Sequence, residues 1–209
     1  MIPRILLTIA LAASAAMAQY KMEPAGPPPP ELAPAFAQAL QKDGARILNA
    51  SGSVICEVWL RSTAPSGPPS TEANVTLPTI PHGAFLGVIR YPARYNDRRG
   101  LTIQPGIYTL RYSLYPTNGE HVGISPQRDF AILVRAADDT DVNATPNFDD
   151  LMAMSRKASG SPHPATLSIW KSALDKFPAF EKEGDKDWVL NAKMGDVPLA
   201  IILIGKFEG

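Results

Sequence analysis

The stretch 101–136 limits the fold more than any other part of the chain, because it has the pattern of two long strands joined by a polar loop. After a Pro105-Gly106 turn, apolar and polar side chains alternate with a period of two over 108–114. That alternation is typical of a half-buried strand. It returns over 130–134, and the residues between the two strands include the turn formers Asn118-Gly119. The stretch therefore predicts a β-hairpin.

The rest of the chain also favours short strands over βα alternation. Further strands or hairpins are predicted at 46–62, 73–77, 84–91, 165–170 and 187–205, and short helices at 31–42 and 147–158. The last arm, 199–204, is apolar on both faces, which predicts a central strand covered on both sides. Residues 171–186 are rich in Lys and Glu and predict a solvated connection. The expected fold is mainly β, an antiparallel β-sandwich of jelly-roll type with two short helices.

The N-terminus has the pattern of a secretory signal peptide. One basic residue, Arg4, precedes an apolar run over 5–17 that ends in Ala16-Met17-Ala18, the small-residue pattern of a cleavage site. We expect residues 1–18 to be removed, residues 19–30 to form a disordered proline-rich leader, and residues 31–209 to form one domain in the periplasm or outside the cell. The apolar run is too short to span a bilayer, so no membrane span is expected after cleavage.

Charge and cysteine content narrow the function classes. The chain has 20 basic and 20 acidic side chains, so loss of Arg4 leaves a net charge of −1. A nearly neutral surface argues against a nucleic-acid partner. Cys56 is the only cysteine, which excludes an internal disulfide, and it alternates with Val54 and Val58 as a buried apolar residue would.

Several segments together resemble a group of uncharacterised secreted bacterial β proteins with a domain of unknown function. The segments are ASGSVICEVWLR, IPHGAFLGVIRYP, TIQPGIYTLRY, SPQRDFAILVRAADDTD, RKASGSPHPA and PLAIILIG. The PG-x-YTL start of the hairpin is similar to that of secreted domains expected to be β-sandwiches. The resemblance implies a fold and an exported location, but no activity and no catalytic residue.

The three histidines each lie in a loop built from Gly or Pro. If His82, His121 and His163 meet at one end of a sandwich, neutral imidazoles with the Glu120 carboxylate suit a divalent metal. Their spacing fits no local metal motif, so ordinary loop histidines are the alternative.

An acidic loop precedes the second helix. Asp139, Asp141, Asn143 and Asp150 place oxygen ligands at calcium-loop spacing, although Ala144 stands where a tight turn favours glycine. The alternative is an Asx-rich loop that caps the following helix.

Aromatic side chains raise a third hypothesis, that of glycan or peptide binding. Trp59 and Tyr115 alternate with the apolar faces and are the expected exposed members of a stacking platform. Arg111 and Arg128, near Asp129, are expected to form an outer-face ion pair.

The sequence contains no Walker loop, dinucleotide fingerprint, G-x-S-x-G elbow, H-E-x-x-H or C-x-x-C motif. It therefore favours a non-enzymatic binding or structural accessory without a cofactor, whose ligand is unknown. A metal-binding protein or metal-dependent enzyme that uses the loop histidines is the alternative.

Overall fold

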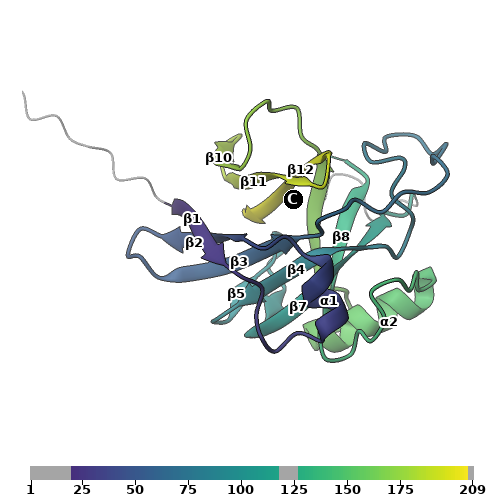
Figure 1. Cartoon of the computed structure of the whole chain (residues 1–209), viewed down its shortest axis with the longest axis horizontal. Helices are drawn as coiled ribbons and strands as arrows, with labels where there is room; N and C mark the ends of the chain where they lie inside the picture. Colours follow the sequence, from purple (N-terminus) through teal and green to yellow (C-terminus); the bar gives the residue numbers. More distant parts are fainter. Residues whose placement is uncertain (1–19, 118–126, 207–209) are drawn as a thin grey trace, which may run out of the picture.

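The computed structural model describes residues 20–117 and 127–206. Within them the chain forms ten strands of one antiparallel sheet, a two-stranded hairpin and two helices (Figure 1). The main strands are β1 (Tyr20–Gly26), β2 (Gly44–Asn49), β3 (Val54–Leu60), β4 (Phe85–Tyr91), β7 (Gly106–Leu114), β8 (Asp129–Arg135), β9 (Thr166–Lys171), β10 (Ala179–Glu183), β11 (Asp187–Met194) and β12 (Val197–Ile204). The small hairpin is β5 (Tyr95–Asn96) with β6 (Thr102–Ile103), and the helices are α1 (Pro34–Ala39) and α2 (Phe148–Ser159). The predicted class, mainly β and antiparallel with two short helices, is confirmed.

The sheet has the order β1-β2-β3-β4-β7-β8-β9-β12-β11-β10 and turns back on itself. Strand β9 makes the corner, because Thr166–Ser168 pair with β8 while Ile169–Lys171 pair with β12. The strands before β9 thus form one layer and β10–β12 form a second layer that faces it. The first and last strands, β1 and β10, come close to each other, so the sheet is nearly closed.

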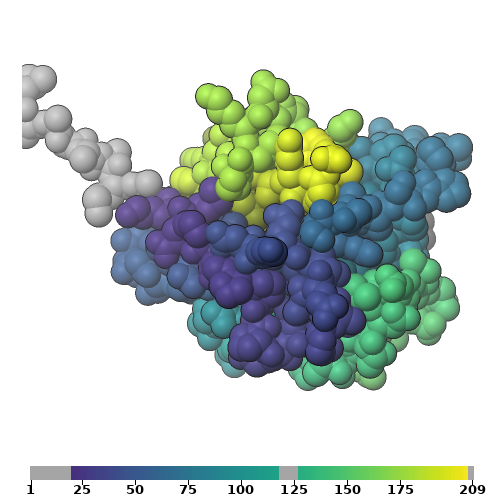
Figure 2. All heavy atoms as spheres, viewed as in Figure 1, coloured from purple at the N-terminus to yellow at the C-terminus, as the bar shows by residue number. Residues whose placement is uncertain are grey.

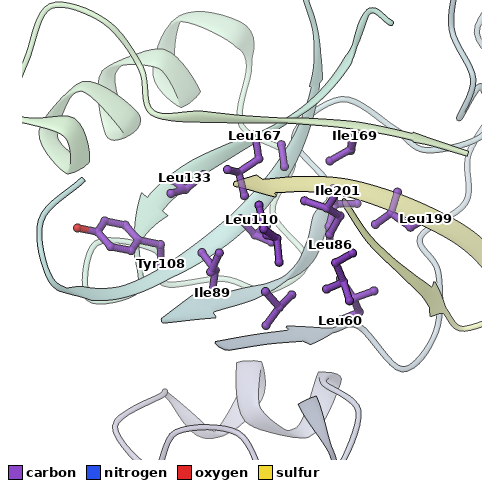
Figure 3. Close-up of a cluster of buried hydrophobic side chains, with 14 of the residues drawn as sticks. Leu60, Leu86, Ile89, Tyr108, Leu110, Leu133, Leu167, Ile169, Leu199 and Ile201 are labelled. Carbon is purple, nitrogen blue, oxygen red and sulfur yellow. The ribbon is translucent and has the colours of Figure 1, made fainter. Parts of the chain in front are cut away.

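The main core lies between the two layers (Figure 3). Leu60, Leu86 and Leu110 point inward from the first layer, and Ile169, Leu199 and Ile201 meet them from β9 and β12. All six side chains are buried. Cys56 belongs to the same cluster and has no exposed surface, which confirms the prediction of a buried apolar thiol. Burial raises the pKa of this thiol and keeps it protonated.

Tight turns set the register of two hairpins where the sequence predicts them. Asn49 caps the turn between β2 and β3 by accepting hydrogen bonds from the backbone N–H groups of Ser51 and Ser53, and Gly52 takes a positive φ of 80°. Strands β11 and β12 are joined by the two-residue turn Gly195-Asp196. The last arm is central, as expected, since β12 pairs with both β11 and β9. It is also covered on both faces, because the five successive residues 199–203 are all buried.

The β7–β8 hairpin forms as predicted, but its polar face is not exposed. Thr109, Arg111 and Ser113 have no exposed surface, because the loop before β4, residues 137–147 and α2 cover this side of the sheet. The outer-face ion pair expected between Arg111 or Arg128 and Asp129 is wrong. The carboxylate of Asp129 instead accepts hydrogen bonds from Tyr112 and from the backbone at Thr76 and Leu77.

Local sequence signals predict the bounds of α2 well, but they predict those of α1 poorly. Asn147 caps α2 by accepting from the N–H of Asp150 at 3.0 Å, and Gly160 ends the helix in the left-handed region, as the sequence predicts. Helix α1 begins at Pro34 and is much shorter than the expected 31–42. It lies over the outer side of β3 and β4 (Figure 1), where Phe36 packs edge-on against Phe85.

Three expectations for the connections are wrong. Residues 20–26 of the supposed disordered leader form β1, because their backbone pairs along the whole length of β2. The supposed solvated connection contains β10, which pairs with β11 from Ala179 to Glu183. Residues 73–77 form no strand.

A cleft at the seam of the sheet

The seam between β1 and β10 leaves two sheet edges without a neighbouring strand in the described part of the chain. Both edges carry residues that discourage pairing with another strand: Lys21, Glu23 and Pro24 on β1, and the charged run 181–183 on β10. The edges approach each other without forming a backbone ladder. In Figure 2 the purple N-terminal strands meet the yellow-green C-terminal strands along this boundary.

Aromatic rings close one end of the seam. The Tyr20 ring meets the Trp188 ring edge-on at a centroid distance of 5.1 Å, and the Phe180 ring lies 5.5 Å from the same indole. These three residues come from β1, β11 and β10, so they join the two layers. At the other end, the amide of Gln41 donates a hydrogen bond to the carbonyl of Lys193 at 2.5 Å.

Between these closures lies an open cleft of about 530 Å³. One wall comes from β1 to β3, and the other comes from β11 and the residues before β10. The apolar lining residues are Met22, Pro24, Ala45, Val58, Leu60, Phe177, Pro178, Leu190 and Ala192. Val58, Leu60 and Leu190 also belong to the main buried cluster, so the cleft leads from solvent directly to the core.

Alanine residues on both walls, Ala45 and Ala192, leave this space open. Beside Ala45, Gly44 lets the outer layer pack closely, because a Cβ there would lie 2.6 Å from the indole of Trp59. The indole is itself fixed, since its Nε1–H donates to the carbonyl of Gly26 at 2.8 Å. Ala45 follows on β2 and Ala192 lines the opposite wall, where larger residues would fill the gap.

The predicted metal ligands do not form a site in the described part of the chain. His121 and Glu120 lie outside the described residues. His82 bonds to Ser113, whereas His163 is exposed and its backbone carbonyl accepts from Ser159. Among described residues, no three His, Cys, Asp or Glu side chains gather closely enough to hold a metal ion. The proposal of a site with all four ligands stays a prediction.

His82 lies in a second cleft of about 510 Å³ next to α2. Its Nδ1 is 3.2 Å from the Ser113 hydroxyl, and its ring is 6.1 Å from that of Phe148, which is 41% exposed. Burial lowers the pKa of the His82 imidazole, and the nearby backbone of Pro146 and Asn147 only partly offsets this. His82 is therefore neutral at pH 7 and joins β7 to the start of α2.

The acidic loop is organised around Arg111. Both carboxylate oxygens of Asp139 accept from the buried guanidinium at 2.7 Å, which leaves this residue poorly placed to bind calcium. The Asp141 carboxylate caps the N–H of Asn143, and the Asp150 carboxylate accepts from the Asn147 amide. These contacts agree with the alternative interpretation, a loop that caps α2.

The expected aromatic platform is wrong for both of its named residues. Trp59 is 2% exposed because α1 covers the outer face of β3. Tyr115 is 6% exposed, and its ring stacks on Phe130 at 4.1 Å in a cluster covered by α2. Neither ring can stack on a glycan.

Sequence reasoning missed the cleft because its walls come from segments more than a hundred residues apart. The only local signal was the Phe177-Pro178 pair and Phe180 inside a charged stretch, where three apolar residues indicate a segment packed on the domain. Comparison of the chain with protein-family models, curated proteins and solved structures finds no match. The resemblance to secreted bacterial β proteins therefore stays a prediction. None of the described helices has the length and apolar character needed to cross a membrane.

Proposed function

We propose that this chain is an exported, non-enzymatic binding protein whose seam cleft holds a small and largely apolar ligand. The observation that carries the proposal is an open cleft whose walls are continuous with the main core. Its volume of about 530 Å³ falls within the usual range of roughly 300–1,000 Å³ for ligand sites. Such sites combine mainly apolar walls with a few polar groups, which is the composition found here.

The position of the cleft also supports this role. The aromatic contact between Tyr20 and Trp188 and the Gln41 hydrogen bond hold the two walls together at either end. The space is thus preformed, and a ligand does not have to separate the layers to enter. Preformed sites bind more tightly because less ordering accompanies binding.

Export is proposed from the N-terminal pattern. The apolar run over 5–17 and Ala16-Met17-Ala18 favour cleavage before Gln19. The mature protein then starts next to β1, whose Tyr20 contributes to the seam. Intact mass of the exported protein tests this directly, and retention of residues 1–18 contradicts it.

The binding proposal is tested with N-phenyl-1-naphthylamine, a neutral probe whose fluorescence rises in apolar surroundings. We expect saturable binding to the wild-type protein. Ala45→Phe places a ring in the cleft and should abolish that binding. The matched control, Ala153→Phe, adds the same ring on the exposed side of α2 and should bind like wild type.

Both variants are first compared with wild type by thermal unfolding, because only folded variants are informative. Equal probe binding by wild type and Ala45→Phe would overturn the cleft as the binding site. No saturable binding by wild type would overturn the proposed function, a site for a largely apolar ligand.

A further inference from the structure

Three charged side chains line the rim of the seam cleft, and they differ in whether they have a polar partner. On one lip, Glu23 faces Arg46 with an oxygen–nitrogen distance of 3.6 Å, and Asp43 accepts the N–H of Gly26 at 2.7 Å. On the other lip, Lys193 has no ion pair and no side-chain hydrogen bond with any described residue. Lys193 is thus the one charged lining residue whose head group still lacks a polar partner in the described structure.

The Lys193 ammonium lies beside an aromatic ring that lines the cleft. Its Nζ lies 5.7 Å from the centroid of the Phe177 ring, which also lines the cleft. Its backbone is fixed within β11, and its carbonyl accepts the bond from Gln41. The side chain is exposed, so an incoming group can reach the charge without displacing a protein partner.

We infer that the ligand of the seam cleft is an amphiphile with an anionic head, of the long-chain carboxylate class. This inference rests on the proposed function of the cleft. The acyl chain lies between the apolar walls, and the carboxylate stays at the rim beside Lys193, since an unpaired charge in the apolar interior is strongly unfavourable. The Asp43 carboxylate disfavours an anionic head at the opposite lip and so orients the ligand.

The contribution of the ligand's acyl chain to the binding affinity should follow the apolar surface that it buries. Each methylene buried between the walls should tighten binding by about fourfold, which corresponds to roughly 0.8 kcal/mol. Decanoate should therefore bind about fifteenfold more tightly than octanoate. The increase should stop once the chain fills the cleft.

The head-group contribution is tested by displacement of N-phenyl-1-naphthylamine with decanoate and with decanol. In wild type, decanoate should compete about fivefold better than decanol at low salt, and the difference should shrink as salt screens the exposed charge. Lys193→Gln should remove this preference and leave decanol unchanged. The control Lys182→Gln, on the exposed edge strand β10, should behave like wild type.

The outcomes separate this inference from the proposed function. If decanol and decanoate compete equally in wild type, or if Lys193→Gln leaves the preference intact, the anionic head is refuted while the cleft remains a ligand site. If the probe binds wild type but neither amphiphile displaces it, the acyl class is refuted. Failure of the probe to bind at all counts against the proposed function itself.

Discussion

Replacement of Arg111 by methionine tests how the polar face of the central hairpin is stabilised. The guanidinium is fully buried and donates to both oxygens of Asp139. It also donates to the carbonyls of Gly83, Asp141 and Ala144 at 2.5 to 2.7 Å. This one side chain therefore links the loop before β4 and the loop before α2 to β7.

The expected loss of stability follows from the buried groups that the substitution leaves without a partner. Arg111→Met buries the Asp139 carboxylate without its cation and leaves three carbonyls without their donor. Breaking a buried pair from one side costs about 3–5 kcal/mol. A domain with a total stability of about 5–15 kcal/mol should then unfold at a much lower urea concentration.

Urea unfolding followed by tryptophan fluorescence measures this loss. Arg135→Met is the control, because Arg135 is an exposed arginine on the neighbouring strand β8, and it should change stability by less than about 0.5 kcal/mol. The double variant Arg111→Met with Asp139→Leu should lose less than the sum of the two single losses, because no charge is left buried alone. A loss below about 1 kcal/mol for Arg111→Met would refute this account of the buried pair.

Three further predictions concern stability. Cys56→Ser should lower the free energy of unfolding, measured in urea, by about 1–3 kcal/mol, because it buries a hydroxyl without a partner. Probe binding should not change. A variant that is as stable as wild type but no longer binds the probe would give the thiol a functional role. Because burial lowers the pKa of His82, the unfolded chain takes up a proton that the folded protein does not, so stability should fall as the pH drops below about 6.5. His82→Gln should reduce the dependence of stability on pH between pH 7 and pH 5. An unchanged dependence would show that other groups cause it. Calcium at millimolar concentration should leave the melting temperature unchanged, because Asp139 is already paired with Arg111; a clear rise would restore the calcium hypothesis.

Local sequence signals predicted the elements that local contacts define. Helix α2 has its cap at Asn147 and its stop at Gly160, both of which act within a few residues. The hairpin turn at Gly195-Asp196 is likewise specified by the residues that form it. In such elements the residues that make the stabilising contacts lie close together in the sequence, so the sequence pattern predicts the structure directly.

Long-range contacts explain what the sequence did not reveal. Alternation identified the strand that contains Arg111, but it could not show that the polar face would be covered, because the partner Asp139 lies beyond the return strand. Proline content suggested disorder for residues 20–26, yet pairing with β2 orders them. The cleft required three-dimensional information, since Ala45 and Ala192 face each other only after the sheet has folded back.

Methyl NMR during titration with decanoate tests the central claim most directly. The account predicts that the signals of Val58, Leu60 and Leu190 shift with one saturating binding curve, while those of Leu151 beneath α2 stay unchanged. Shifts confined to Leu114 in the His82 cleft, or no saturable shifts at all, would contradict a ligand site at the seam.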